Sequence, residues 1–61
     1  MRYAVTINGR HVKTIEEREL LPYAAQLSEA GFRVYPEGTG FGAIREDAFP
    51  ATVVLCEGFE G

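Results

Sequence analysis

The 61-residue sequence has one cysteine, Cys56, one histidine, His11, and no tryptophan. One cysteine cannot form an intramolecular disulfide, and a structural zinc site needs four ligands where the cysteine and histidine offer two. A chain of this length buries only about 60% of the surface that its unfolded form exposes, so we expect marginal stability. Stability must then come from an ordinary core, from self-association or from a partner chain.

The sequence also lacks long apolar runs and concentrated positive charge. No run approaches the roughly 18 apolar residues of a transmembrane helix, and the opening MRYAVTING lacks the apolar core of a signal peptide. Because a free thiol suits a reducing compartment, we expect a soluble, cytoplasmic protein. Six Lys or Arg against nine Asp or Glu give a net charge of −3, and all nine acids lie from residue 16 onward. This balance predicts no direct binding to nucleic acid. It favours as partner another protein with a basic or nucleic-acid-binding surface.

Alternating apolar residues predict an N-terminal β-hairpin. The turn signal Asn8-Gly9 follows the alternating segment 3–7. A two-residue turn there sets Val5 opposite Val12. The expected faces are Tyr3, Val5, Ile7 and Val12 on one side and Thr6, His11 and Lys13 on the other.

One helix is predicted next. Its apolar stripe consists of Leu20, Leu21, Ala24 and Leu27. Thr14 to Glu17 fits a capping box, but a helix beginning there would place Pro22 in its interior at a cost of about 3 kcal/mol. We therefore expect a start near residue 19 or 20, with residues 15–19 as a lead-in and the proline in the first turn. Gly31 predicts a left-handed cap that folds Phe32 back on the helix.

The remaining chain predicts two or three strands. Residues 32–35 alternate and end at Pro36, and the nearly continuous apolar run 51–56 is the candidate central strand. A short strand at 41–45 and a turn at 46–50 lie between them. The expected fold class is α+β, a single domain of residues 1–61 with a hairpin, one α-helix, then two or three antiparallel strands, the helix packing on one face of the sheet.

The glycine-rich stretch EGTGFGAI, residues 37–44, invites comparison with phosphate-binding loops. A dinucleotide-binding loop needs G-x-G-x-x-G before a helix, whereas this stretch has G-x-G-x-G and 19 residues after Gly42. A nucleotide-triphosphate loop needs Lys and then Ser or Thr after its last glycine, and Ala43-Ile44 stands there. We expect neither kind of phosphate site.

Gly40-Phe41-Gly42 resembles part of the aromatic octapeptide of RNA recognition motifs, whose rings stack on bases. The positions of the basic residue and of the two remaining aromatics hold Thr39, Ala43 and Glu46. Base stacking is therefore not expected, and the stretch is interpreted as a glycine-softened connection between strands. Phe41 then either folds back over the core or serves as an anchor for a partner.

Candidate catalytic groups are few. The only Cys/His dyad would be His11 with Cys56, which we expect on different strands. Glu46 and Asp47 are adjacent in a turn, and neighbours there do not converge on one substrate. We expect no enzyme, cofactor or metal.

The expected function is protein binding. A small, motif-poor, mildly acidic domain fits the general profile of phage or mobile-element inhibitors that block a host machine, anti-CRISPR proteins among them. The alternative is an accessory or structural subunit of a permanent complex, or a homodimer formed by pairing sheet edges, and a small enzyme comes third. The candidate partner-binding residues are Glu16, Glu17, Glu19, Tyr35, Phe41, Glu46 and Asp47.

Overall fold

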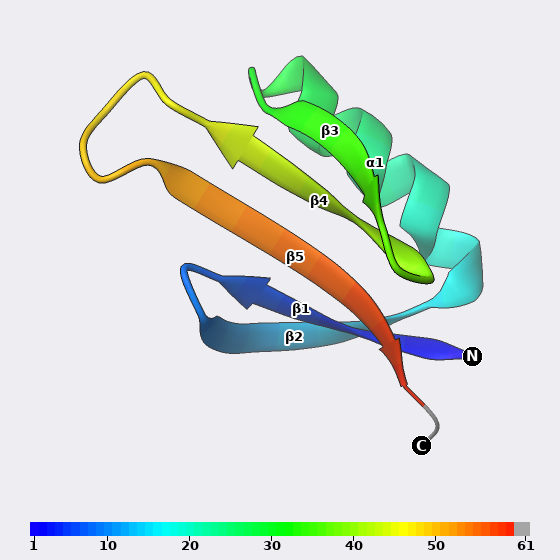
Figure 1. Cartoon of the computed structure of the whole chain (residues 1–61). Coiled ribbons are helices and arrows are strands. Elements are labelled where there is room, and N and C mark those ends of the chain that lie inside the picture. The colour runs from blue at the N-terminus through cyan, green and yellow to red at the C-terminus, as the bar shows by residue number, and fades with distance from the viewer. Residues whose placement is uncertain (60–61) are drawn as a thin grey trace.

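A computed structural model describes residues 1–59 and shows a five-stranded antiparallel sheet with one helix on one face (Figure 1). The elements are β1 (Arg2–Ile7), β2 (Arg10–Glu16), the 3₁₀ turn η1 (Glu17–Glu19), α1 (Leu20–Glu29), β3 (Arg33–Glu37), β4 (Gly40–Arg45) and β5 (Thr52–Phe59). The strand order is β2-β1-β5-β4-β3. The predicted fold class is confirmed, and β5, which contains most of the predicted central strand, is the middle strand of the sheet.

Both ends of α1 follow local sequence signals. The helix begins at Leu20, so Pro22 lies in its first turn as predicted. The capping-box pattern of Thr14 to Glu17 does not start a helix, and the expected lead-in of residues 15–19 consists of the end of β2 and of η1. At the other end, Gly31 has φ +96° and the Phe32 amide donates to the Leu27 carbonyl over 3.0 Å. This Schellman geometry confirms the predicted left-handed cap.

The register of the first hairpin differs from the prediction. The turn pairs Ile7 with Arg10 as expected, but a β-bulge then shifts the register, so that Val5 pairs with Lys13. Val12 has no partner on β1, and its side chain is 47% exposed instead of joining the core. Lys13 consequently lies on the helix side of the sheet, where its ammonium sits 4.4 Å from the centre of the Tyr23 ring.

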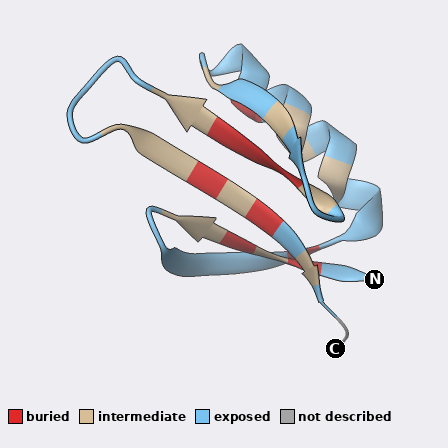
Figure 2. Ribbon diagram, in the orientation of Figure 1, coloured by how far each residue is buried: buried red, intermediate tan, exposed pale blue. Residues whose placement is uncertain are grey.

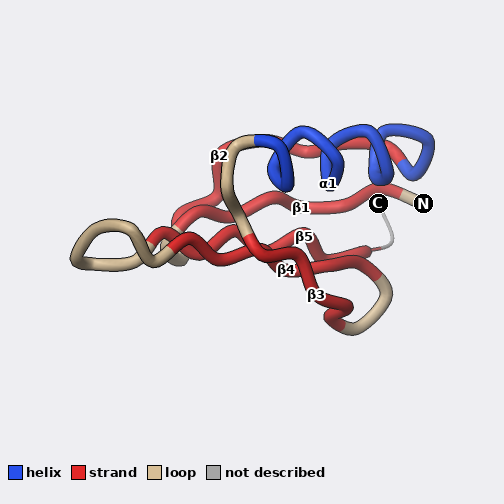
Figure 3. The backbone as a smooth tube through the Cα atoms, turned by 90° about the horizontal axis from the view of Figure 1, so that it is seen from above, coloured by secondary structure: helices blue, strands red, loops and turns tan. Residues whose placement is uncertain are grey.

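The core lies between α1 and the sheet (Figure 2). Its buried residues are Tyr3, Val5, Ile15, Leu27, Phe41, Ala43, Val54 and Cys56. Seen from above, the helix runs along one side of the sheet (Figure 3). Within residues 1–59, no element covers the opposite face of the sheet, which turns toward the viewer in Figure 1.

Candidate protein-binding surfaces

The acids at the start of the helix are held by local contacts. Glu17 lies 3.8 Å from the N-terminal amine, and Glu16 lies 3.9 Å from Arg18. The Glu19 carboxylate accepts a hydrogen bond from the Glu16 amide over 3.0 Å. These three predicted partner-binding residues are exposed and close together, but each already has an intramolecular partner.

Glu46 and Asp47 begin the 46–51 loop at the other end of the sheet. The Glu46 carboxylate accepts a hydrogen bond from Arg33 over 2.9 Å, and Asp47 lies 3.2 Å from Nε of Arg45. Arg2, the first residue of β1, pairs with Glu16, the last residue of β2, at one end of the sheet. The 46–51 loop joins β4 and β5 at the opposite end (Figure 1). The structure therefore does not bring the five predicted acids into one acidic surface.

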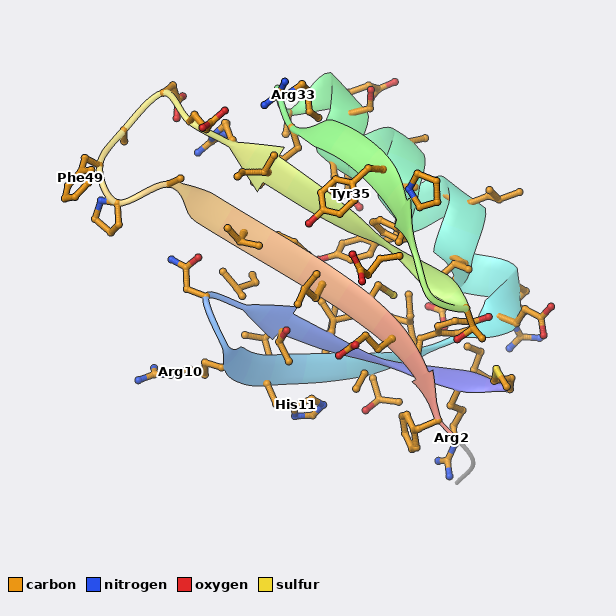
Figure 4. All side chains as sticks on the ribbon, viewed as in Figure 1. Arg2, Arg10, His11, Arg33, Tyr35 and Phe49 are labelled. Carbon is orange, nitrogen blue, oxygen red and sulfur yellow. The ribbon has the colours of Figure 1, made fainter. Side chains whose placement is uncertain are left out.

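The predicted loop carrying Tyr35 and Phe41 is instead the β3–β4 hairpin, and the two rings lie on opposite faces of the sheet. Phe41 points toward α1, is 6% exposed and packs edge-on against Tyr23 with the ring centres 6.1 Å apart. Tyr35 pairs with Gly42 and lies on the uncovered face (Figure 4). Of the two interpretations of Phe41, the structure thus supports the ring folded into the core.

The uncovered side of the sheet is apolar at its centre, and we call it the open face. Side chains alternate along each strand, so the neighbours of the buried residues point to this side. The half-buried residues of the open face are Ala4, Thr6, Tyr35, Ile44, Val53 and Leu55. The apolar run 51–56 contained the signal for this surface. A strand that is apolar on both sides is typical of a sheet covered on both faces, whereas a single predicted helix can cover only one face.

Phe49, whose side chain is 99% exposed, is not among the residues predicted from the sequence. It lies on the 46–51 loop and points away from the molecule (Figure 4). Both acids at the start of this loop form ion pairs with arginines of β3 and β4, so the loop is tethered at its base while the phenylalanine projects. The available signal was an aromatic residue inside a turn-like segment, directly before Pro50.

Cys56 and His11 do not form a dyad, because they lie on opposite sides of the sheet. Cys56 is fully buried on the helix side, whereas His11 is exposed on the open face, where its Nε2 lies 3.3 Å from the Thr14 hydroxyl. Burial raises the pKa of the Cys56 thiol above its ordinary value of 9.0, and the positive charge of Lys13 partly offsets this. Burial and the charge of the Cys56 thiolate raise the pKa of Tyr23 above its ordinary value of 10.0.

A groove of about 400 Å³ separates β2 from α1. Lys13, Arg18 and Tyr23 are among the residues that line it.

Within residues 1–59, no group of three His, Cys, Asp or Glu side chains is placed to hold a metal ion. In the same part of the chain, no helix has the length and apolar character that crossing a bilayer requires.

Comparison with known proteins adds no relative. The chain matches no family model, and no curated protein or solved structure is significantly similar to it.

Proposed function

We propose that this protein is a protein-binding module without chemistry of its own that blocks a functional surface of a larger protein. The observation that supports this most directly is Phe49, which is 99% exposed in a loop whose first two residues form ion pairs with the sheet. Exposing a phenylalanine forgoes about 1.5–3 kcal/mol of burial. Aromatic residues that fill a pocket on a partner carry much of the energy of protein interfaces. We propose an apolar pocket on the partner as the site for this ring.

The mode of action is steric occlusion. A chain of 61 residues with one projecting anchor needs only a rigid scaffold to cover a site on a larger protein. Two ion pairs, Arg33 with Glu46 and Arg45 with Asp47, tether the first two residues of the loop to the sheet, which reduces the conformational freedom that is lost on binding. Small size, acidic net charge and this anchor are compatible with a phage or mobile-element inhibitor of the anti-CRISPR type, which we propose as the biological class.

The test is binding to a partner isolated from the native host by affinity purification with the wild-type chain. Phe49→Ala is expected to weaken that complex at least tenfold, the equivalent of about 1.4 kcal/mol. Leu21→Ala is the matched control, because Leu21 is also exposed, at 80%, and lies on α1 away from the loop. We expect this control to keep its affinity within about twofold.

Neither substitution removes a buried side chain, so both variants should unfold at the wild-type temperature. Calorimetric titration then reports binding alone. Equal affinity of Phe49→Ala and wild type would overturn the assignment of Phe49 as the anchor. Loss of affinity in both variants would show that the binding surface includes the helix as well as the loop, so that Phe49 is not the single anchor.

A further inference from the structure

The open face carries charges of both signs in equal number on the three strands β1, β3 and β5, and none on β4. Strand alternation and pairing place Arg2, Arg33, Glu37 and Glu57 on this face, around the apolar centre. The chain as a whole has a net charge of −3, but these four residues sum to zero. On the edge strand β2, Glu16 pairs with Arg2 and lies 3.9 Å from Arg18, so its charge is compensated locally. A nearly neutral face with an apolar centre does not repel a second copy of itself.

The arrangement along β3 is self-complementary. Arg33, Tyr35 and Glu37 follow one another on the open face at alternate positions, so the two charges flank the ring about 13 Å apart. A two-fold axis that lies in the plane of contact and crosses the strands at Tyr35 brings Arg33 of one copy to Glu37 of the other. The same axis brings Glu37 of the first copy to Arg33 of the second, as an isologous interface requires.

Arg33 can make this contact while keeping its intramolecular partner. It uses one terminal nitrogen for Glu46, over 2.9 Å, and its side chain remains 78% exposed. A guanidinium has five N–H donors, so one group can bridge two carboxylates. Leu55, on the central strand β5 and in the same row as Tyr35, meets its own counterpart in this arrangement.

Both edges of the sheet carry features that oppose strand pairing. β3 contains Pro36, which has no amide hydrogen, and β2 contains the bulge at Val12. Prolines and bulges are devices by which edge strands avoid further pairing. Association between copies is therefore favoured at the open face over the sheet edges that the sequence suggested.

We propose that two copies of this chain associate through their open faces, in an antiparallel sandwich with paired Arg33 and Glu37. Each copy gains a second layer over the apolar residues that α1 leaves uncovered. Five strands about 4.8 Å apart and about 20 Å long bury roughly 500 Å² per copy, near the lower limit for a specific interface. The dimer is expected to dissociate in the micromolar range. This proposal does not depend on Phe49, which lies outside the open face.

The test is sedimentation equilibrium from about 5 to 500 μM, a range chosen for an interface of this size. Wild type should show a reversible monomer–dimer equilibrium. Arg33→Glu and Glu37→Arg each place like charges opposite one another and should each weaken the dimer at least tenfold. In a 1:1 mixture of the two variants, both contacts of the mixed dimer again join one acid and one arginine. The mixture should therefore recover an affinity within about threefold of wild type.

Three controls separate this interface from other effects. Arg10→Glu and Glu29→Arg make the same charge changes at exposed positions outside the open face and should leave the dimer intact. Glu46→Ala removes the intramolecular partner of Arg33 and should also leave it intact. Circular dichroism shows whether each variant is folded before it is compared.

Two results would overturn the proposal. One is a wild-type chain that stays monomeric up to the highest concentration, which would leave the open face to a different partner. The other is a dimer whose mixed charge variants associate no better than each variant alone, which would place the contact elsewhere. Either result leaves the Phe49 hypothesis untouched, so the two failures are distinguishable.

Discussion

The three alternate glycines of EGTGFGAI do three different things. Gly38 has φ +54° and makes the turn between β3 and β4. At Gly40 a Cβ would run into the backbone carbonyl of Cys56 on the neighbouring strand. At Gly42 a Cβ would lie 2.5 Å from Cζ of Tyr35, whose ring covers this position. The stretch is therefore a strand and its turn, with close approach of a backbone at one glycine and of a side chain at another.

Alanine substitutions at the two strand glycines are expected to differ in cost. Gly40→Ala meets backbone that cannot move without disturbing β5, so it should lower the free energy of unfolding by more than about 2 kcal/mol. Gly42→Ala meets the end of the Tyr35 ring, which can rotate toward solvent, and should cost less than about 1 kcal/mol. Urea unfolding followed by circular dichroism measures both. Equal costs would contradict the distinction between fixed backbone and mobile ring.

Phe41 and Phe49 show how far single residues could be predicted. For Phe41, sequence reasoning left core and anchor open, because the face on which a side chain lies depends on how its strand pairs. Pairing of Phe41 with Cys56 on β5 decides the matter, and no local pattern contains that contact. Phe49 was passed over because a turn segment gives no indication of which of its side chains the rest of the chain covers.

At the scale of elements, local signals predicted what depends on local geometry. The helix start just before Pro22, the Schellman motif at Gly31 and the central position of β5 follow from backbone chemistry or from apolar runs. The hairpin register could not be predicted in this way. Asn8-Gly9 sets only the pair next to the turn, Ile7 with Arg10, and the bulge at Val12 then shifts the register. The bulge buries Ile15 next to Tyr3 in the core and leaves Val12 exposed, which the turn sequence alone does not specify.

The bulge determines which of two aliphatic residues of β2 contributes to stability. Ile15 is 5% exposed, so Ile15→Ala should lower the free energy of unfolding by about 2–4 kcal/mol. Val12→Ala removes a half-exposed side chain without a cross-strand partner and should cost less than about 0.5 kcal/mol. The regular register without a bulge buries Val12, so a large cost there would indicate that register. Chemical denaturation at neutral pH is the measurement.

The whole molecule is built as two layers with one core between them. Within residues 1–59 its sheet packs against one helix, and no other element covers the opposite face. The candidate acids illustrate the limit of prediction at this scale. Charge counting along the chain found an acidic majority after residue 15, but the fold sends Glu16, Glu17 and Glu19 to one end and Glu46 and Asp47 to the other. Sequence totals do not record that separation.

The core also contains an ionisable group at its centre, and global stability should depend on it at alkaline pH. In the unfolded chain the Cys56 thiol loses its proton near its ordinary pKa of 9.0, whereas burial raises the pKa in the folded protein. Above about pH 9 the folded state therefore binds more protons than the unfolded state, and stability falls as pH rises through the folded value. Below pH 8 this contribution is constant.

Urea unfolding between about pH 7 and 10.5, under reducing conditions, tests this dependence. Wild type should lose stability steadily above about pH 9. Cys56→Ala should be less stable at pH 7, because it leaves a small cavity beside Val5 and Val54, yet show a shallower alkaline slope. Tyr23→Phe should reduce only the steeper part at the highest pH, since the pKa of Tyr23 is raised from 10.0. An unchanged slope in Cys56→Ala would mean that other groups cause the alkaline loss of stability. A thiol with the same pKa in the folded and unfolded states does not make stability depend on pH.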